Sequence, residues 1–309
     1  MNLKAIFFLS LSFFIITLNG HAKIIGKLLV NGSEKHVMQV SQATNLEVFM
    51  VDDTTGETLT EYRRMHMKYM HFVIMKNDLT VFKHIHPYLD AQSGKFMMPI
   101  NLPNGDFDNQ DAKKAITEPG EYHVYAEVDF KDIGMRKFHW ILTAEGPGEN
   151  VFRERQLDLN IGHNKIFKYF ADDGISSTYG AKYEGVLTYH TIQGCGGNFL
   201  TFKLDIKEFD PQFGYKAIDS FTPWLMMGGH VILLNTAKAG EKRPSVFAHL
   251  HSKMPNLENP SFEFTHFDRN IMNKDKYSFW VQFGHRGKIL SIPFVFAYTP
   301  PEAIELACN

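Results

Sequence analysis

Cysteine and net charge are both scarce in this sequence, and the signatures of several enzyme classes are missing. Only two of the 309 residues are cysteines, Cys195 and Cys308, and the absence of Cys-x-x-Cys gives no support to thioredoxin-like redox chemistry. In an oxidising compartment these cysteines either form one bridge or remain two thiols. The formal net charge of −2 gives no electrostatic case for nucleic-acid binding. Without a Gly-x-Ser-x-Gly sequence or a glycine-rich phosphate loop, nucleophilic hydrolysis and nucleotide chemistry have no support.

Long apolar runs are confined to the N-terminus. Lys4 is followed by an almost unbroken apolar run that ends at Leu18, and Gly20-His21-Ala22 places small residues at a cleavage position. This order predicts a secretory signal peptide over residues 1–22, with a mature chain that starts near Lys23. The alternative is an uncleaved anchor, although the run is short for crossing a bilayer. We therefore expect a periplasmic or extracellular protein without stable membrane insertion after cleavage.

Amphipathic helical periodicity is scarcely visible, whereas short runs with strand character recur along the chain. The 27 phenylalanines favour β structure. Turn signals such as Asn31-Gly32 and Pro119-Gly120 separate the runs at a spacing that is typical of an antiparallel sandwich. The length suggests two domains, and Glu145-Gly146-Pro147-Gly148 marks a boundary between them.

The sequence thus predicts an all-β fold with two antiparallel, immunoglobulin-like or cupredoxin-like β-sandwich domains in tandem. The predicted segments are a signal peptide (1–22), a first β-sandwich domain (23–145), a linker with lead-in strands (146–180), a second β-sandwich domain (181–299) and a C-terminal tail (300–309).

The stretch MHMKYMHFVIMKNDLTVFKHIHP carries four histidines in a strand–turn–strand pattern. Its turn falls on Asn77-Asp78, which suits a tight hairpin, and a turn centred there places His71 opposite His84. Because side chains alternate along a strand, His86 shares their face, and opposed Cβ atoms lie about 5 Å apart. Three imidazoles can therefore converge on one ion, with His66 or a nearby methionine completing its ligands.

The second half of the chain repeats this pattern around a longer loop. His230 precedes an apolar run, and His249 and His251 form another His-x-His pair. A loop centred on Ala239-Gly240 pairs His230 with His249, so the first histidine again faces the first member of the pair. The repeat indicates an internal duplication and predicts a second ligand group in the second domain.

Several residues of the first half also form an ordered motif. They are His66-x4-His71, Asp78, Phe82, His84-x-His86-Pro87 and Pro119-Gly120-x-Tyr122. In this order they resemble a largely uncharacterised family of bacterial secreted β-sandwich domains whose members read H…MHLIVV…D…F-x-H-x-HP…PG-x-Y. The resemblance implies a sandwich fold, export and an association with copper handling. The second half departs from the motif, because Ser252 replaces the proline of the His-Pro pair and Leu225 stands where His66 would fall.

The histidine pattern predicts a metal site. Imidazole suits copper, zinc and nickel, and His-x-His on a strand places two imidazoles on one side. Methionines flank the first two histidines, and their soft thioethers favour Cu(I) over zinc. The structural alternative is that the histidines are hydrogen-bonded residues at the rim of a core and that the methionines only pack. The predicted metal ligands are His66, His71, His84, His86, His230, His249 and His251, with copper as the expected metal and zinc as the second choice.

The sequence is richer in groups that hold a metal than in groups that make and break bonds. A multicopper oxidase would share the sandwich domains and the His-x-His pairs, but Cys195 lacks the flanking histidines of an electron-transfer copper site. We expect an exported metal-binding protein for copper storage, delivery or detoxification, with the metal ion and a protein for metal transfer as its partners. The alternative is a secreted adhesion or protein-interaction module with structural histidines and no metal, and a metalloenzyme ranks third.

Overall fold

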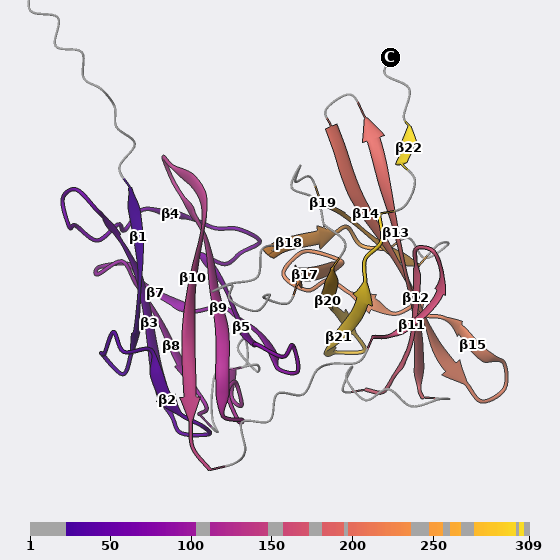
Figure 1. The fold of residues 1–309 in the computed structure, drawn as a ribbon, viewed down its shortest axis with the longest axis horizontal. Coiled ribbons are helices and arrows are strands. Elements are labelled where there is room, and N and C mark those ends of the chain that lie inside the picture. The colour runs from indigo at the N-terminus through magenta and orange to yellow at the C-terminus, as the bar shows by residue number, and fades with distance from the viewer. Residues whose placement is uncertain are drawn as a thin grey trace, which may run out of the picture.

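The computed structural model describes residues 23–102, 112–147, 157–172, 181–194, 197–235, 247–255, 260–266, 275–300 and 303–305. Within these ranges the chain is built from β-strands and contains no α-helix, so the all-β prediction is confirmed. Figure 1 shows two β-rich lobes that follow one another along the chain. In the described part of the chain, no helix is long and apolar enough to cross a membrane. The predicted signal peptide, Cys195 and Cys308 lie outside the described residues.

The first lobe contains two sheets. One has the strand order β1-β3-β8-β7, and the other has the order β2-β10-β9-β5-β6 with β4 beside β9. The strand bounds are β1 (Ile24–Val30), β2 (Val37–Gln39), β3 (Thr44–Asp52), β4 (Tyr62–Arg63), β5 (Met70–Lys76), β6 (Phe82–Ile85), β7 (Tyr88–Asp90), β8 (Lys95–Ile100), β9 (Gly120–Phe130) and β10 (Gly134–Glu145). The pairs are antiparallel except that β2 joins β10 in parallel.

The second lobe also contains two sheets. One has the order β11-β12-β13-β14-β15 with β19 beside β14 and β22 beside β13, and the other has the order β16-β20-β17-β18 with β21 beside β20. The strand bounds are β11 (Leu159–Gly162), β12 (Lys165–Phe170), β13 (Tyr183–Gly194), β14 (Gly197–Asp210), β15 (Gly214–Ala217), β16 (Phe221–Thr222), β17 (Gly229–Asn235), β18 (Phe247–Ser252), β19 (Ser261–His266), β20 (Lys276–His285), β21 (Lys288–Ala297) and β22 (Ala303–Glu305). Strands β11 and β12 fall in the segment predicted as linker and lead-in strands, and β22 falls in the predicted tail; all three join the second lobe.

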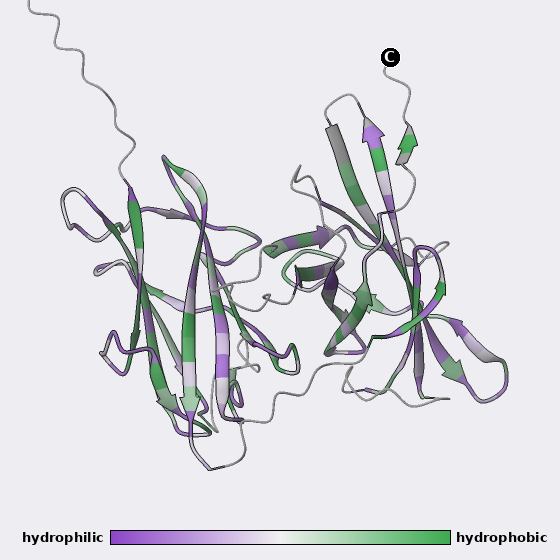
Figure 2. Cartoon of the chain, in the orientation of Figure 1, coloured by the Kyte–Doolittle hydropathy of each residue, from purple (hydrophilic) through white to green (hydrophobic). Residues whose placement is uncertain are grey.

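Each lobe is a sandwich because one face of each sheet is apolar. In β3 every second residue over 44–50 is buried, as the alternation of side chains on a half-covered strand requires. Figure 2 shows this alternation as green and purple bands along the strands. The inward side chains of the first lobe form one core that includes Leu46 and Phe72, and those of the second lobe form another that includes Phe202 and Phe279. The predicted tandem of β-sandwiches is therefore confirmed.

The first histidine hairpin forms, but its register differs from the predicted one by two residues. Val73, rather than His71, lies opposite His84. The turn lies later than Asn77-Asp78 because Leu79 takes the left-handed conformation, with φ 62°, and the Lys76 N–H donates to the Val81 carbonyl. A shift of two residues leaves each side chain on its original face, since the period of a strand is two.

The second hairpin shows the same shift. Ile232 pairs with His249, and His230 pairs with His251. The predicted loop centre, Ala239-Gly240, lies outside the described residues. As in the first hairpin, the three histidines remain on one face of the sheet.

The two lobes share one order of strands around these hairpins. The order β10-β9-β5-β6 in the first lobe corresponds to β21-β20-β17-β18 in the second, and β4 and β16 occupy the same place beside β9 and β20. The correspondence extends to a four-residue turn before β5 and before β17. The turn over 65–68 has positive φ at His66 and Met67, and the turn over 224–227 has positive φ at Leu225 and Met226. We call residues at the same place in this shared order equivalent.

The sheets that carry the hairpins pack against each other. Strands β5 and β17 are buried at every position, because the sandwich core covers one face and the other lobe covers the second. Phe82 stacks on Trp280 at a ring-centroid distance of 4.7 Å, and Tyr125 stacks on Phe247 at 4.1 Å. Phe82 and Phe247 are equivalent, as are Tyr125 and Trp280, so the two contacts are reciprocal. This apolar contact fixes the faces that carry the histidines against one another.

Candidate metal centre

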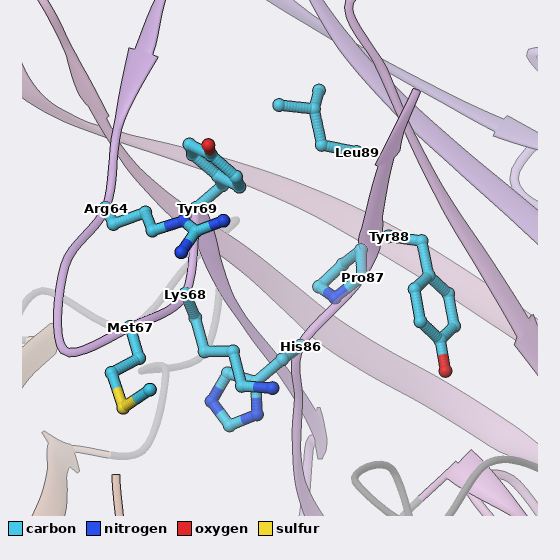
Figure 3. Close-up of a pocket in the computed structure, with 8 residues that line it drawn as sticks. All are labelled: Arg64, Met67, Lys68, Tyr69, His86, Pro87, Tyr88 and Leu89. Carbon is cyan, nitrogen blue, oxygen red and sulfur yellow. The ribbon is translucent and has the colours of Figure 1, made fainter. Parts of the chain in front are cut away.

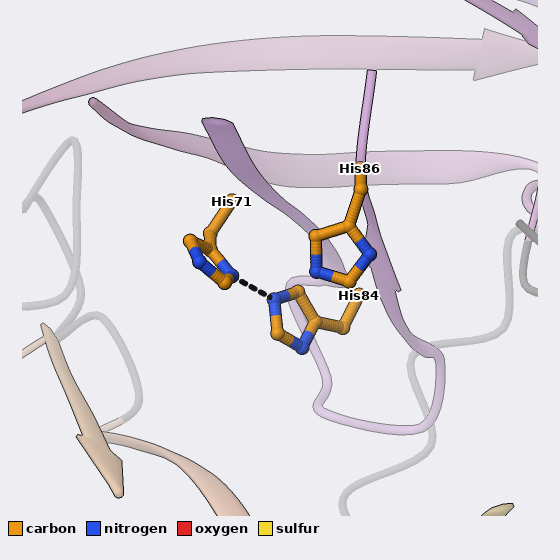
Figure 4. Close-up of side chains that lie close together, drawn as sticks. All are labelled: His71, His84 and His86. Atoms are coloured by element: carbon orange, nitrogen blue, oxygen red, sulfur yellow. Dashed lines mark hydrogen bonds between the residues drawn. The ribbon is translucent and has the colours of Figure 1, made fainter. Parts of the chain in front are cut away.

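Three histidines converge in each lobe. His71 on β5, His84 on β6 and His86 after β6 form the first histidine group, and their ring nitrogens include a set that lies within 4.8 Å of one another. Figure 4 shows the three rings pointing toward one another, with the contact between His71 and His84 dashed. His230 on β17 with His249 and His251 on β18 form the second histidine group, which meets the same distance limit.

The two groups meet at the interface between the lobes. The ring centroids of His71 and His249 lie 4.7 Å apart, and those of His84 and His249 lie 5.2 Å apart. His230 lies 6.3 Å from His71 and 6.1 Å from His84. The sequence predicted one site in each domain, but the structure brings both groups into a single cluster.

The equivalent turns of the two lobes reach across this interface in opposite directions. His66, on the turn of the first lobe, lies with its ring 4.0 Å from His251 and 6.1 Å from His230, whereas its ring is 6.3 Å from His71. The sequence analysis expected His66 to complete the first histidine group. In the structure it stands nearest to the second group.

Trp224 makes the reciprocal approach from the second lobe. Its ring centroid lies 5.7 Å from that of His84 and 6.2 Å from that of His86, and it is also 4.8 Å from His230. The indole therefore covers the first histidine group with an apolar surface that contributes to its exclusion from water.

Two further side chains hold the histidines from the opposite lobe. The His249 Nδ1 lies 2.8 Å from a carboxylate oxygen of Glu127 on β9, and the His84 Nδ1 lies 3.0 Å from the Gln282 Oε1 on β20. Glu127 pairs with His71 across its sheet and Gln282 pairs with His230, so these two residues are equivalent. Each acceptor binds the outer nitrogen of a histidine and leaves its Nε2 to face the cluster, as the supporting residues of metal sites do.

Sequence reasoning missed Glu127 and Gln282. They are 122 and 198 residues away from the histidines that they contact, and no spacing rule connects positions in two different domains. The only available signal was their place on the strand after Pro119-Gly120 and on its counterpart in the second half.

Burial keeps the imidazoles neutral. The pKa of His71 is lowered to about 3 and that of His84 to about 4, in each case first by loss of solvation. Burial also lowers the pKa of His251 to about 3 and the pKa values of His230 and His249 well below the usual range. Neutral imidazole is the form that binds a metal, so at neutral pH the cluster is ready for a cation.

Within the first group, His71 and His84 have fewer ring N–H hydrogens than their contacts need. The contacts run from the Met65 carbonyl oxygen to His71 Nε2 (3.3 Å), from His71 Nδ1 to His84 Nε2 (3.0 Å) and from His84 Nδ1 to Gln282 Oε1 (3.0 Å). These contacts form a row that ends in an oxygen acceptor on each side, the Met65 carbonyl and the Gln282 Oε1. Three hydrogen bonds need three hydrogens, but the neutral imidazoles of His71 and His84 supply two. With the hydrogens on the outer nitrogens, His71 and His84 turn two lone pairs toward each other.

A metal ion resolves that mismatch. Two nitrogens bound to one tetrahedral ion at about 2.0 Å lie about 3.3 Å apart, which is close to the 3.0 Å between His71 Nδ1 and His84 Nε2. The outer nitrogens would then donate to the Met65 carbonyl and to Gln282, and every hydrogen would have an acceptor.

The second group has buried ring nitrogens that lack a hydrogen-bond partner among the described residues. They are both nitrogens of His230 and the Nε2 atoms of His249 and His251. Buried polar atoms in folded proteins nearly always have a partner, and an unsatisfied one costs about 1–3 kcal/mol. Ligation of a metal would satisfy these nitrogens without a hydrogen bond.

The cluster does not include Met67 or Met70, which flank histidines in the sequence, nor the polar residues Asp129 and His285 as ligands. Met70 is packed in the core of the first lobe, and Met67 is an exposed turn residue. Asp129 pairs with Arg63 at 3.4 Å. His285 contacts Ser220, away from the cluster.

A cavity of about 230 Å³ opens beside the first group. His86 lines it together with Arg64, with residues 67–69 and with residues 87–89, as Figure 3 shows. The side chains of Lys68 and Arg64 both line this cavity, so its electrostatic character is positive. Among the six grouped histidines, His86 is the one that lines this cavity.

Comparisons with known proteins add little to this geometry. No protein-family model matches the chain, and no curated protein matches it. One similar structure is of carbohydrate-binding modules with promiscuous specificity, from the β-sandwich superfamily. The alignment covers 88% of this chain and 94% of that chain, at 8% identity and a TM-score of 0.21. A structure of a 1.5-MDa bacterial ice-binding adhesin aligns with 93% of this chain and 99% of its own, at 8% identity and a TM-score of 0.23. Likeness at this level says nothing about the ligand of the cluster.

Proposed function

We propose that this protein is an exported metal-binding protein that holds copper at the histidine cluster, for storage, delivery or detoxification. The observation that carries the proposal is the convergence of three neutral imidazoles in each lobe, whose ligand nitrogens lie within 4.8 Å of one another. The orphaned nitrogens of the second group support the same reading. The apolar N-terminal run and the resemblance to secreted sandwich domains support export.

The chemistry of the ligands favours copper over zinc. Both groups consist of histidine alone, with no carboxylate or thiolate among their members. Such a neutral, largely buried set does not offset the charge of an ion. The cost of desolvating a charge rises with its square, so a divalent ion costs roughly four times as much as a monovalent one. Cu(I) is monovalent and is bound well by imidazole, and zinc, which imidazole also suits, is the second choice.

The proposal is tested by elemental analysis of the protein without residues 1–22, after exposure to copper or zinc and desalting. The variant His84→Ala/His86→Ala removes two ligands of the first group. The control His123→Ala/His139→Ala also removes two histidines, which contact each other at 3.0 Å elsewhere on the sheet. We expect wild type and control to retain copper and the first variant to lose part or all of it.

Near-zero metal in all three proteins would contradict the proposal. The histidines would then be structural, and a secreted adhesion or protein-interaction module would be the better description. Equal retention by all three proteins would show that the metal binds elsewhere.

A further inference from the structure

We propose that the two histidine groups form one dinuclear copper centre with unequal halves: a closed half of four histidines and an open half of three that takes a small inorganic anion. This inference rests on the proposed function, because it assumes that the cluster binds copper. To the proposed function it adds the number of copper ions, the different roles of the two ions and the class of exogenous ligand that one of them binds.

The closeness of the groups makes the centre dinuclear. Each group has enough imidazoles for one ion, and the nearest rings of the two groups are 4.7 Å apart, a distance shorter than several within a single group. Ions held by the two groups therefore lie within a few ångströms of each other, as in other two-metal sites. Such ions interact directly and do not behave as independent sites.

The closed half contains a ligand from the other lobe. His66 reaches from the turn of the first lobe to a ring distance of 4.0 Å from His251, and the turn is fixed by paired backbone hydrogen bonds between Met65 and Lys68. With His230 and His249 this makes four imidazoles, the number typical of closed structural sites. The ion in this half would join both lobes.

The open half lacks such a fourth histidine. The residue equivalent to His66 is Leu225, whose turn has the same backbone shape, with φ 51° at Leu225 and 48° at His66. Leucine cannot bind a metal, so the first group keeps three protein ligands. Three ligands and one exchangeable position are the arrangement of metal sites that bind exogenous ligands.

The surroundings of the open half select an anion. His86 lines the cavity, and Lys68 lies near enough for its charge to act on both His71 and His86. Arg64 adds a second cation to the lining. Two copper ions bound in the divalent state would put four positive charges among neutral ligands, so an anion that enters from the cavity would lower the energy of the Cu(II)-loaded centre.

Two substitutions test the halves separately, and each one copies the equivalent residue of the other lobe. His66→Leu copies Leu225, and Lys68→Met copies Met227, so the turn should tolerate both. Circular dichroism checks the fold of each variant. The protein is loaded with Cu(II), its copper is counted per chain, and its electron paramagnetic resonance signal is integrated. Sodium azide, a small anion, is then titrated into the Cu(II)-loaded protein while the absorption spectrum is followed.

We expect two copper ions per chain in the wild type, with a resonance signal well below that of two isolated Cu(II) ions. His66→Leu should weaken retention of one ion by about tenfold or more. Lys68→Met should keep two ions and weaken azide binding by about tenfold, because the cation beside the open position is lost.

Each contrary result has a distinct meaning. One ion per chain, or two ions with the full signal of isolated Cu(II), would overturn the dinuclear centre while leaving the proposed copper binding intact. Unchanged copper retention in His66→Leu would overturn the closed half, and unchanged azide binding in Lys68→Met would overturn the anion site. No copper in the wild type would refute the proposed function, and this inference with it.

Discussion

The crossed contacts of Glu127 and Gln282 lead to a sharp prediction about which ion each residue supports. Glu127 belongs to the first lobe but accepts a hydrogen bond from His249 of the second, and Gln282 belongs to the second lobe but contacts His84 of the first. We therefore expect Glu127→Leu to weaken the ion of the second histidine group, and Gln282→Leu to weaken that of the first. Each substitution affects the lobe that does not contain it.

The magnitude follows from the geometry of the two contacts. The lengths of 2.8 and 3.0 Å indicate good hydrogen bonds to ligand histidines, and loss of such a partner typically lowers metal affinity by 10- to 100-fold, about 1.4 to 2.7 kcal/mol. Glu127→Leu should lower the free energy of unfolding of the copper-free protein less than Gln282→Leu does. Burial raises the pKa of the Glu127 carboxyl, so an apolar replacement also removes a cost of desolvation.

Competition with a copper chelator measures these affinities, and a disabled second group separates the two ions. In a His249→Ala/His251→Ala background, Gln282→Leu should still lower the remaining affinity by 10- to 100-fold. Glu127→Leu should leave it unchanged, because its histidine partner is gone. The reasoning fails if Glu127→Leu weakens the remaining ion as much as Gln282→Leu does.

Three other outcomes are expected. Phe82→Ala should lower the free energy of unfolding of the copper-free protein, measured in guanidinium, by about 3–5 kcal/mol, because it removes the stack on Trp280 between the lobes. A loss below about 1 kcal/mol would show that this stack does not hold the lobes together. The copper-free protein should lose stability as the pH falls from 6.5 toward 4, because the unfolded chain binds protons at His71 and His84 while burial keeps their folded pKa values near 3 and 4. Each of these histidines should lower the free energy of unfolding by up to about 1.4 kcal/mol per pH unit. A free energy of unfolding that stays constant between pH 6.5 and 5 would be inconsistent with neutral buried imidazoles. Leu225→His should supply the open half with a fourth ligand and abolish azide binding while two ions remain, and azide binding at wild-type strength would show that this turn does not reach the first ion.

The sequence was sufficient to predict the hairpins and the histidine faces but not the register. The alternation of side chains along a strand is local, so His71, His84 and His86 could be placed on one face from spacing alone. The register depended on Leu79, which takes a left-handed conformation that its residue type does not favour. The error was an even number of residues, and the face was therefore preserved.

The union of the two groups could not be predicted from the sequence. It depends on how two sandwiches pack, through contacts such as that of Phe82 with Trp280, between residues far apart in the chain. The same holds for His66, whose spacing from His71 suggested the first group. Its turn instead extends toward the other lobe, where its ring meets His251.

Crystallographic localisation of copper by anomalous scattering at its absorption edge, in the copper-loaded protein, tests the shared centre most directly. We predict two peaks a few ångströms apart between the lobes, one among His71, His84 and His86 and the other among His66, His230, His249 and His251. A single peak, two widely separated peaks, or copper bound only at surface residues would contradict a joint centre.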